Sequence, residues 1–158
     1  MPVSEDEFRN ALSCFASGIS IVTTKDAAGN PHGITVSAFC SVSLDPPLVL
    51  ICIEKTTVSH DAFTQSNAFV VNILDESQMH LSERFAAPLD DKFGDIEIRP
   101  GIEGIPVLTG ALASIECRLR QACDGGDHSI FIGEVEKTHV REGAPLVYFR
   151  HTYGTVSE

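Results

Sequence analysis

A histidine lies in a glycine-rich turn in the C-terminal third of the chain, within the run Asp124-Gly125-Gly126-Asp127-His128. The glycines and aspartates predict a tight turn between two strands, where an imidazole has little packing reason to be. With an ordinary pKa of about 6.5, a histidine at this point is suited to hydrogen-bonding a substrate or accommodating charge. The alternative is a structural role, in which His128 hydrogen-bonds the turn and Asp127 fixes its tautomer.

A second group of residues carries donors suited to an anion. Glu54-Lys55-Thr56-Thr57 supplies an ammonium, two hydroxyls and backbone amides just before a short predicted helix, whose N-terminus favours negative charge. His60 lies one turn into that helix, and Arg84, near the end of a later helix, is a second candidate cation. The alternative for Lys55 and Arg84 is an ordinary solvated surface charge.

Several common catalytic motifs are absent from the sequence. It contains no Gly-x-Gly-x-x-Gly, no Walker loop, no His-Glu-x-x-His and no Gly-x-Ser-x-Gly. Cys117, Cys123 and His128 fit no common zinc spacing, so no metal site is expected. These absences favour a function that needs no activated nucleophile, such as hydride transfer between bound cofactors or simple ligand carriage.

The composition argues against two other classes of protein. Asp and Glu number 22 against 11 Lys and Arg, and the formal charge of −11 repels nucleic acid. The longest apolar run, Leu48–Ile53, is far shorter than the roughly 20 residues of a membrane-spanning helix. The acidic start lacks the apolar core of a signal peptide, and the five cysteines show no Cys-x-x-Cys spacing. We therefore expect a cytoplasmic protein with reduced cysteines.

The elements that position these residues begin with a helix. Ser4-Glu5-Asp6-Glu7 is a capping box, and Gly18 is suited to a helix end. Apolar residues recur at helical spacing between them, at Phe8, Ala11, Leu12 and Phe15. The pattern predicts an amphipathic helix of about 13 residues that packs across the elements that follow it.

Most of the remaining chain predicts strands. Strands are expected over residues 19–24, 33–43, 48–53, 68–74, 113–122, 129–139 and 146–149, with helices over 59–65 and 75–85. The strand over 48–53 is expected to be buried on both faces. Pro46 and Pro47 are expected to end the strand that precedes it, and residues 87–106 are expected to form a surface loop. The 158 residues, with 43% hydrophobic and 21% charged residues, predict one mainly β domain over residues 1–158, built as a closed or partly closed antiparallel barrel with a few peripheral helices.

The chain resembles the short-chain flavin reductases along nearly its whole length. The matching segments are 8–18, 22–24, 32–37, 39–48, 69–74, Gln78, 81–86, 126–128, 131–135, 145–146 and Tyr153. The most specific are Ser41-Val42-Ser43-Leu44-Asp45-Pro46-Pro47 and Gly126-Asp127-His128. The resemblance implies an FMN-binding split barrel, antiparallel and Greek-key-like, which is usually a homodimer.

The resemblance also implies an activity. Members of this family use NADH or NADPH to reduce FMN or FAD, and many pass the reduced flavin to a separate flavin-dependent oxygenase. A non-catalytic FMN-binding carrier or electron-transfer module on the same barrel is the alternative. The choices between FMN and FAD, and between NADH and NADPH, stay open; Arg118 and Arg120 are candidate ligands for the extra phosphate of NADPH if they face the pocket.

On this resemblance the candidate residues take specific roles. The residues implied to contact the flavin are Thr35, Val36, Ser37, Ala38, Ser41, Val42 and Ser43 at the ring and ribityl chain, Lys55, Thr56, Thr57, His60 and Arg84 at the phosphate, and Phe85 near the ring. Tyr153 is implied to stack near the flavin or the nicotinamide. His128 is implied to lie by the nicotinamide pocket. The alternative for the small residues and for Phe85 is packing in the core, and residues 90–93 are either part of a substrate entrance or a solvated loop.

Overall fold

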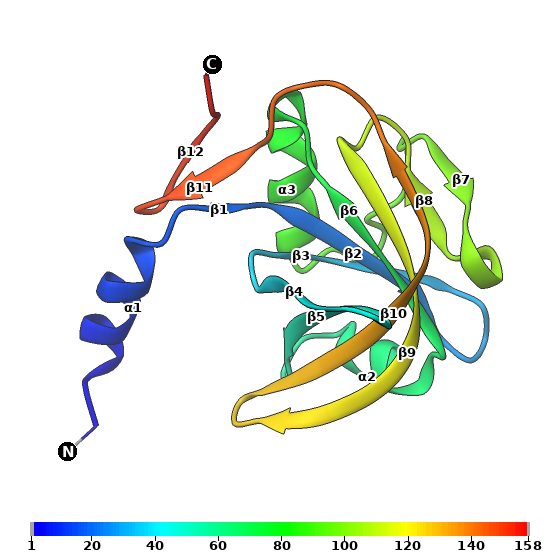
Figure 1. Ribbon diagram of the computed structural model, residues 1–158, viewed down its shortest axis with the longest axis horizontal. Coiled ribbons are helices and arrows are strands. Elements are labelled where there is room, and N and C mark those ends of the chain that lie inside the picture. Colours follow the sequence, from blue (N-terminus) through cyan, green and yellow to red (C-terminus); the bar gives the residue numbers. More distant parts are fainter. Residues whose placement is uncertain (1, 158) are drawn as a thin grey trace.

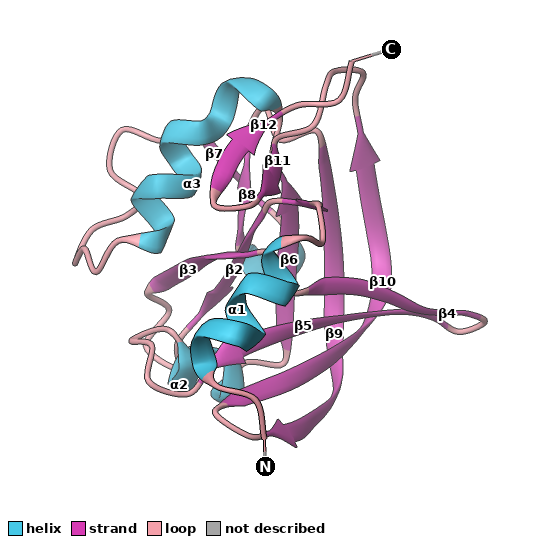
Figure 2. Cartoon of the chain, turned by 90° about the vertical axis from the view of Figure 1, so that its left-hand side faces the viewer, coloured by secondary structure: helices cyan, strands magenta, loops and turns pink. Residues whose placement is uncertain are grey.

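A computed structural model describes residues 2–157 of the protein; Met1 and Glu158, the two ends of the expected domain, lie outside the described residues. The chain is mainly β (Figures 1 and 2). Its helices are α1 (Glu5–Ser13), α2 (His60–Gln65) and α3 (Met79–Ala86), with short 3-10 turns η1 (Glu76–Gln78) and η2 (Ile102–Gly104). Its strands are β1 (Ser17–Gly18), β2 (Ser20–Lys25), β3 (Pro31–Val36), β4 (Phe39–Leu44), β5 (Pro47–Glu54), β6 (Ala68–Ile73), β7 (Ile98–Pro100), β8 (Pro106–Leu108), β9 (Ala113–Gly125), β10 (His128–Val140), β11 (Val147–Phe149) and β12 (Thr152–Gly154).

A seven-stranded sheet forms the body of the molecule, in the order β3-β2-β6-β9-β10-β5-β4 with antiparallel neighbours. The two edge strands, β3 and β4, are consecutive in the chain and are joined by only Ser37 and Ala38. Because so short a link requires both edges of the sheet to meet, the sheet has to curl back on itself. The predicted partly closed antiparallel barrel is confirmed.

The inside of the curled sheet is filled by apolar side chains. The main core cluster contains Val22, Val36, Val49, Ile51, Ile53, Phe63, Phe69, Val71, Cys117 and Phe131. A second cluster lies beneath α3 and includes Leu74, Leu81 and Phe85. Burial raises the pKa of the Cys117 thiol to about 12, so this cysteine is a protonated core residue under ordinary conditions.

The N-terminal helix differs from its prediction. The Ser4 capping box is present, but α1 has nine residues and ends at Ser13, so the expectation that Gly18 ends it is wrong. The reason is tertiary, since Ser17 and Gly18 pair with β11 as strand β1. No residue of α1 is buried, and the helix stands beside the barrel (Figures 1 and 2), so the expectation that it packs across the strands of this chain is also wrong. Within residues 2–157, no helix has the length and apolar character needed to span a membrane.

Three other elements differ from expectation. The strand expected over 33–43 is divided at Ser37 and Ala38, where the chain crosses from one edge of the sheet to the other. In β5 the residues Val49, Ile51 and Ile53 are buried while the alternate positions 48, 50 and 52 are only half-buried, so burial on both faces is wrong. The loop expected over 87–106 contains β7 and η2, because β7 pairs with β8.

A glycine at a bulge of β10 gives a test of core packing. A Cβ atom on Gly133 would lie 2.5 Å from Phe69 Cζ and 2.8 Å from Cys117 Cβ, both in the main core. We expect Gly133→Ala to lower the free energy of unfolding by about 1–3 kcal/mol, measured by urea denaturation. The matched control is Gly18→Ala, where nothing lies within 4 Å of the added carbon and we expect a change within about 0.5 kcal/mol. Equal stability of the two variants would contradict this view of the core.

Candidate functional site

The turn between β9 and β10 is fastened to the segment that follows β5. The Lys55 backbone amide donates to the Asp127 carbonyl at 2.9 Å, and Lys55 Nζ donates to the Gly126 carbonyl at 2.6 Å. Lys55 Nζ also pairs with the Asp124 carboxylate, and this hydrogen bond is the main cause that lowers the pKa of Asp124. The charge of Lys55 is thus compensated by an acidic residue 69 positions away, a contact that no local sequence pattern predicts.

His128 begins β10 and lies opposite Glu54, the last residue of β5. Its Nδ1 is 2.7 Å from the Asp127 carboxylate, and 42% of its side chain is exposed. The hydrogen bond from His128 is the main cause that lowers the pKa of Asp127. An ionised Asp127 accepts from Nδ1–H, which leaves Nε2 of a neutral ring as an acceptor directed to another group. The predicted histidine is therefore both exposed and oriented by its neighbour.

The other members of the predicted anion group lie beside this turn. His60 Nε2 is 2.9 Å from Ser129 Oγ, next to His128 on β10, and its ring is 6.1 Å from that of Phe131. The hydroxyls of Thr56 and Thr57 both donate to Glu54, the first to its carboxylate at 2.6 Å and the second to its carbonyl at 2.9 Å. The structure thus brings together the segment 54–60 and the 124–129 turn, which are far apart in the chain.

A cleft of about 740 Å³ opens next to the segment 56–59. Its other walls are residues 30–34, mostly from β3, and residues 85–93, which follow α3. Lys92, on this last wall, donates to the carbonyls of Phe85 at 2.8 Å and Gly33 at 3.2 Å and forms no ion pair within residues 2–157. Burial lowers the pKa of Lys92. The cleft therefore contains a positive charge without a carboxylate partner in the described chain.

Ser59 adds to the cleft a hydroxyl that has no hydrogen-bonding partner in the described chain. Ser59 is 6% exposed and its hydroxyl makes no hydrogen bond within the described residues. The backbone amides of Thr56 and Val58 likewise have no acceptor in residues 2–157. These donors lie on the cleft wall and are available to a ligand bound there. Ser59 was missed from the sequence, because a serine before a short helix is ordinarily read as a cap.

Arg84 and Phe85 lie at the end of α3, and Phe85 is part of the cleft wall. Arg84 Nη2 donates to the Gly94 carbonyl at 2.5 Å, its buried Nε has no acceptor in the described chain, and its side chain is not part of the cleft wall. The Phe85 ring is fully buried and contacts Phe93 edge-on at 5.1 Å. A Cβ on Gly33 would lie 2.6 Å from the Phe85 ring, so glycine is required where β3 passes over it.

The residues expected at the ring lie where the two sheet edges meet. Ser37, Ala38, Ser41 and Val42 are exposed, Ser43 is half-buried, and Val36 points into the core. The backbone amides of Ser37 and Ala38 have no acceptor within residues 2–157. These two amides are thus free to donate to a ligand placed at this edge.

Ser82 connects this edge to the C-terminal strands. The Thr35 hydroxyl donates to the Ser82 carbonyl at 2.7 Å, and the fully buried Ser82 hydroxyl is 2.9 Å from the Tyr153 hydroxyl. The Tyr153 ring in turn lies 5.2 Å from that of Tyr148. Tyr153 therefore belongs beside Thr35 despite their distance in the chain, and Ser82, which no sequence pattern identified, links them.

Two arginines lie outside the cleft. Arg118 pairs with Glu136 at 2.6 Å and Glu103 at 2.9 Å, and Arg120 pairs with Glu134. Neither arginine is part of the cleft wall. Among residues 2–157, no three His, Cys, Asp or Glu side chains are grouped as metal ligands would be.

Comparison with known proteins gives a consistent result. Residues 12–157 match the family described as flavin reductase like domain. The chain is 42% identical over 150 residues to the FMN reductase (NADH) SmoA of Agrobacterium fabrum, covering 95% of this chain and 85% of that protein. It is 40% identical over 153 residues to the reductase component of a 4-nitrophenol 4-monooxygenase/4-nitrocatechol 2-monooxygenase of Rhodococcus opacus, covering 97% and 82%. It spans only 41% of the length of a probable flavin reductase of Rhizobium meliloti, to which it is 41% identical over 127 residues and 80% of this chain.

Two solved structures that share this fold are named as a flavin reductase and an NADH:FAD oxidoreductase. The flavin reductase PheA2 in its native state superimposes with a TM-score of 0.91 at 37% identity, covering 99% of this chain and 100% of that one. A Streptomyces globisporus NADH:FAD oxidoreductase, SgcE6, in complex with NAD and FAD fragments, superimposes with a TM-score of 0.89 at 32% identity, covering 99% and 98%.

Proposed function

Because this chain belongs to the flavin reductase family, we propose that it reduces FMN or FAD with NADH or NADPH and supplies the reduced flavin to a flavin-dependent oxygenase component. The observation that carries this proposal is the family match over residues 12–157 together with the exposed, carboxylate-oriented His128 beside the segment 54–60. The relative from Rhodococcus opacus, named as the reductase component of a monooxygenase, supports the oxygenase partner. The proposal treats residues 1–158 as a single flavin reductase-like domain.

The residues at the cleft fit a flavin. Its volume of about 740 Å³ is within the range of about 300–1,000 Å³ for small-molecule sites. Lys92 and Ser59 supply an unpaired charge and an unpaired hydroxyl suited to a phosphate. When bound, the flavin supplies a tricyclic ring whose N5 accepts a hydride. Ser37 and Ala38 supply backbone amides that donate to that ring and stabilise negative charge on it.

His128 acts at the nicotinamide in this proposal. Asp127 accepts the hydrogen bond from His128 Nδ1–H, which leaves His128 Nε2 to contact and orient the nicotinamide. His60 and Thr57 support the same end of the barrel through Ser129 and Glu54. Lys55 acts mainly by holding the 124–126 turn in place, since its ammonium already pairs with Asp124 and Gly126.

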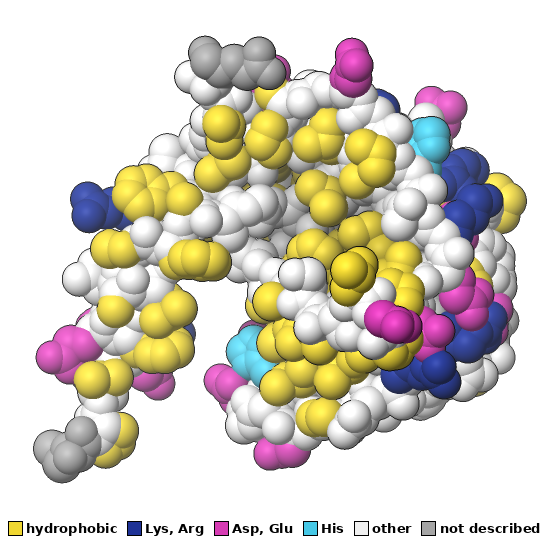
Figure 3. Space-filling view, viewed as in Figure 1, with side chains coloured by type: hydrophobic (Ala, Val, Ile, Leu, Met, Phe, Trp, Pro, Cys, Tyr) yellow, Lys and Arg dark blue, Asp and Glu magenta, His cyan; other side chains and the backbone are white. Residues whose placement is uncertain are grey.

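We also propose that the protein is a cytoplasmic homodimer. Phe8, Leu12 and Phe15 expose 57%, 53% and 75% of their surface, and Figure 3 shows hydrophobic side chains along the N-terminal helix facing open space. A monomer rarely leaves such an apolar helix face in water, whereas a second copy of the chain covers it. The five free thiols of the described chain support the cytoplasmic compartment.

The activity is tested by mixing the protein, FMN or FAD and NADH or NADPH without oxygen. We expect the nicotinamide absorbance to fall and the flavin absorbance to bleach in equal amounts, at turnover numbers of about 1–1,000 per second. Protein incubated with nicotinamide alone is the control, and it should show no sustained decline. Tight flavin binding without nicotinamide oxidation would overturn the reductase and favour a carrier.

A further inference from the structure

We propose that Ser82, in the middle of α3, is a positioning residue for flavin reduction, because its buried hydroxyl makes Tyr153 a hydrogen-bond donor to the bound reactants. The inference rests on the proposed function and adds to it a residue that acts through another side chain. The group that accepts from Tyr153 is a carbonyl oxygen. Both reactants carry such a group, since the flavin ring has carbonyls and the nicotinamide has a carboxamide.

The hydrogen bond between Ser82 and Tyr153 has a definite direction. The Ser82 side chain is fully buried, and its hydroxyl, 2.9 Å from the Tyr153 hydroxyl, has no other partner within residues 2–157. A hydroxyl carries a single hydrogen, and a buried donor that is left unpaired costs free energy. Ser82 therefore donates its hydrogen to Tyr153.

The direction of this bond leaves the hydrogen of the phenol unused. The Tyr153 oxygen accepts from Ser82, and the Tyr153 O–H has no acceptor in the part of the chain that the structure describes. The Tyr153 side chain is half-buried, so a carbonyl of a bound reactant can accept this hydrogen. Without the Ser82 hydroxyl, the phenol hydrogen can turn to other directions and the preference for the reactant is lost.

Ser82 also connects the phenol to the edge of the sheet where the flavin ring is proposed to bind. The Thr35 hydroxyl donates to the Ser82 carbonyl at 2.7 Å. Thr35 lies on β3 two positions before Ser37, whose backbone amide has no acceptor among the described residues. One residue of α3 therefore contacts both β3 and β12, and it brings the phenol of Tyr153 to the edge that carries the free amide.

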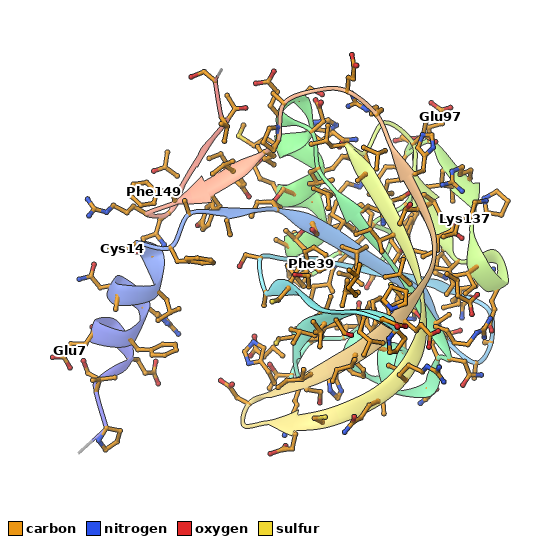
Figure 4. All side chains as sticks on the ribbon, viewed as in Figure 1. Glu7, Cys14, Phe39, Glu97, Lys137 and Phe149 are labelled. Atoms are coloured by element: carbon orange, nitrogen blue, oxygen red, sulfur yellow. The ribbon has the colours of Figure 1, made fainter. Side chains whose placement is uncertain are left out.

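The backbone of Tyr153 is held by contacts that do not involve Ser82. Tyr153 lies opposite Tyr148 in the β11–β12 pair, and the two rings are 5.2 Å apart. The turn of this hairpin is hydrogen-bonded to the end of α1, at the place marked by Phe149 and Cys14 in Figure 4. Loss of the Ser82 hydroxyl should therefore change the orientation of the phenol hydrogen and leave β12 in place.

The test is a double-mutant cycle of Ser82→Ala and Tyr153→Phe. We expect each single variant to lower kcat/KM for NADH about fivefold, because each removes the same directed donor. The double variant should stay within about twofold of the single variants, because the two residues act as one unit. In thermal unfolding, Tyr153→Phe should be less stable than the double variant, since only the single variant leaves the buried Ser82 hydroxyl without a partner.

Titration of the same variants identifies the group that accepts from the phenol. If it is a flavin carbonyl, both single variants should weaken flavin binding about fivefold and shift the visible absorption of the bound flavin. If it is the nicotinamide carboxamide, the flavin Kd should stay within about twofold and the KM for NADH should rise instead. Either result supports the inference.

The matched control is Ser114→Ala. It removes another buried serine hydroxyl, which lies on β9 and accepts from Arg99 Nη2 at 3.2 Å. Its kinetic constants and flavin Kd should stay within about twofold of those of the unaltered protein.

Two results would overturn the inference: kinetic constants and a flavin Kd that are unchanged in Ser82→Ala, or losses that multiply in the double variant. Failure of the unaltered protein to oxidise NADH is a different result, because it contradicts the proposed function itself. Titration of the same variants with flavin and with NAD⁺ then decides the inference without turnover.

Discussion

Replacement of His128 by alanine should lower kcat/KM for NADH by about tenfold or more while changing the Kd for flavin by less than about threefold. We expect the two effects to separate because His128 starts β10 opposite Glu54 and does not line the cleft. Its loss removes the proposed contact to the nicotinamide and leaves the cleft wall unchanged. Steady-state kinetics with NADH as the varied substrate and a separate flavin titration provide the two readouts.

Two further variants test whether the effect is specific to His128. His139→Ala is the matched control, because His139 is exposed on the same strand, pairs with Ser114 and makes no contact with the 124–128 turn. Its constants should match those of the unaltered protein. Asp127→Asn keeps the ring but removes the charge that orients Nδ1–H, and should give an intermediate loss. A His128→Ala protein with unchanged kinetic constants would show that the imidazole serves only the turn.

The double variant Phe8→Asp, Phe15→Asp should convert a dimer into a monomer. Both side chains are more than half exposed in the single chain, and neither contributes to its core clusters. Burial of one aromatic side chain at an interface stabilises the dimer by about 1.5–3 kcal/mol. Two charged replacements in each of two subunits therefore remove a large part of the free energy of association. Sedimentation or light scattering at micromolar concentration measures the change.

The control for this variant is Val140→Asp. Val140 is 71% exposed on β10, and a charge there should leave the mass in solution unchanged. Circular dichroism of both variants checks that the barrel remains folded. An unaltered protein that is monomeric at micromolar concentration, or a double variant that stays dimeric, would contradict the proposed use of the helix face.

Two kinds of local sequence pattern, the helix capping boxes and period-two alternation, predicted their elements correctly. The Ser4–Glu7 capping box formed, and a second box between Asp75 and Gln78 began the segment that leads into α3. Period-two alternation in 113–122 predicted a strand that the structure extends to Gly125. Each of these features is satisfied by groups within a few residues of one another, so local chemistry alone specifies it.

The partners of the candidate site residues depended on contacts between distant segments. The 54–60 segment and the 124–129 turn meet because β5 pairs with β10, a register that no local pattern specifies. This pairing gives Lys55 its Asp124 partner, whereas Lys92 on the cleft wall has no ion pair in the described chain. The place of Tyr153 beside Thr35 likewise arises only through Ser82.

The amino-acid sequence by itself determined the mainly β class, the helix starts, the family and the positions of the candidate histidine and anion-binding segments. The tertiary structure alone decided where α1 ends, how the sheet edges meet at Ser37 and Ala38, and which charges are paired. The physical reason is range. Caps and alternation are satisfied within one turn or strand, whereas charge pairing and clefts exist only after strands distant in the chain have chosen their register.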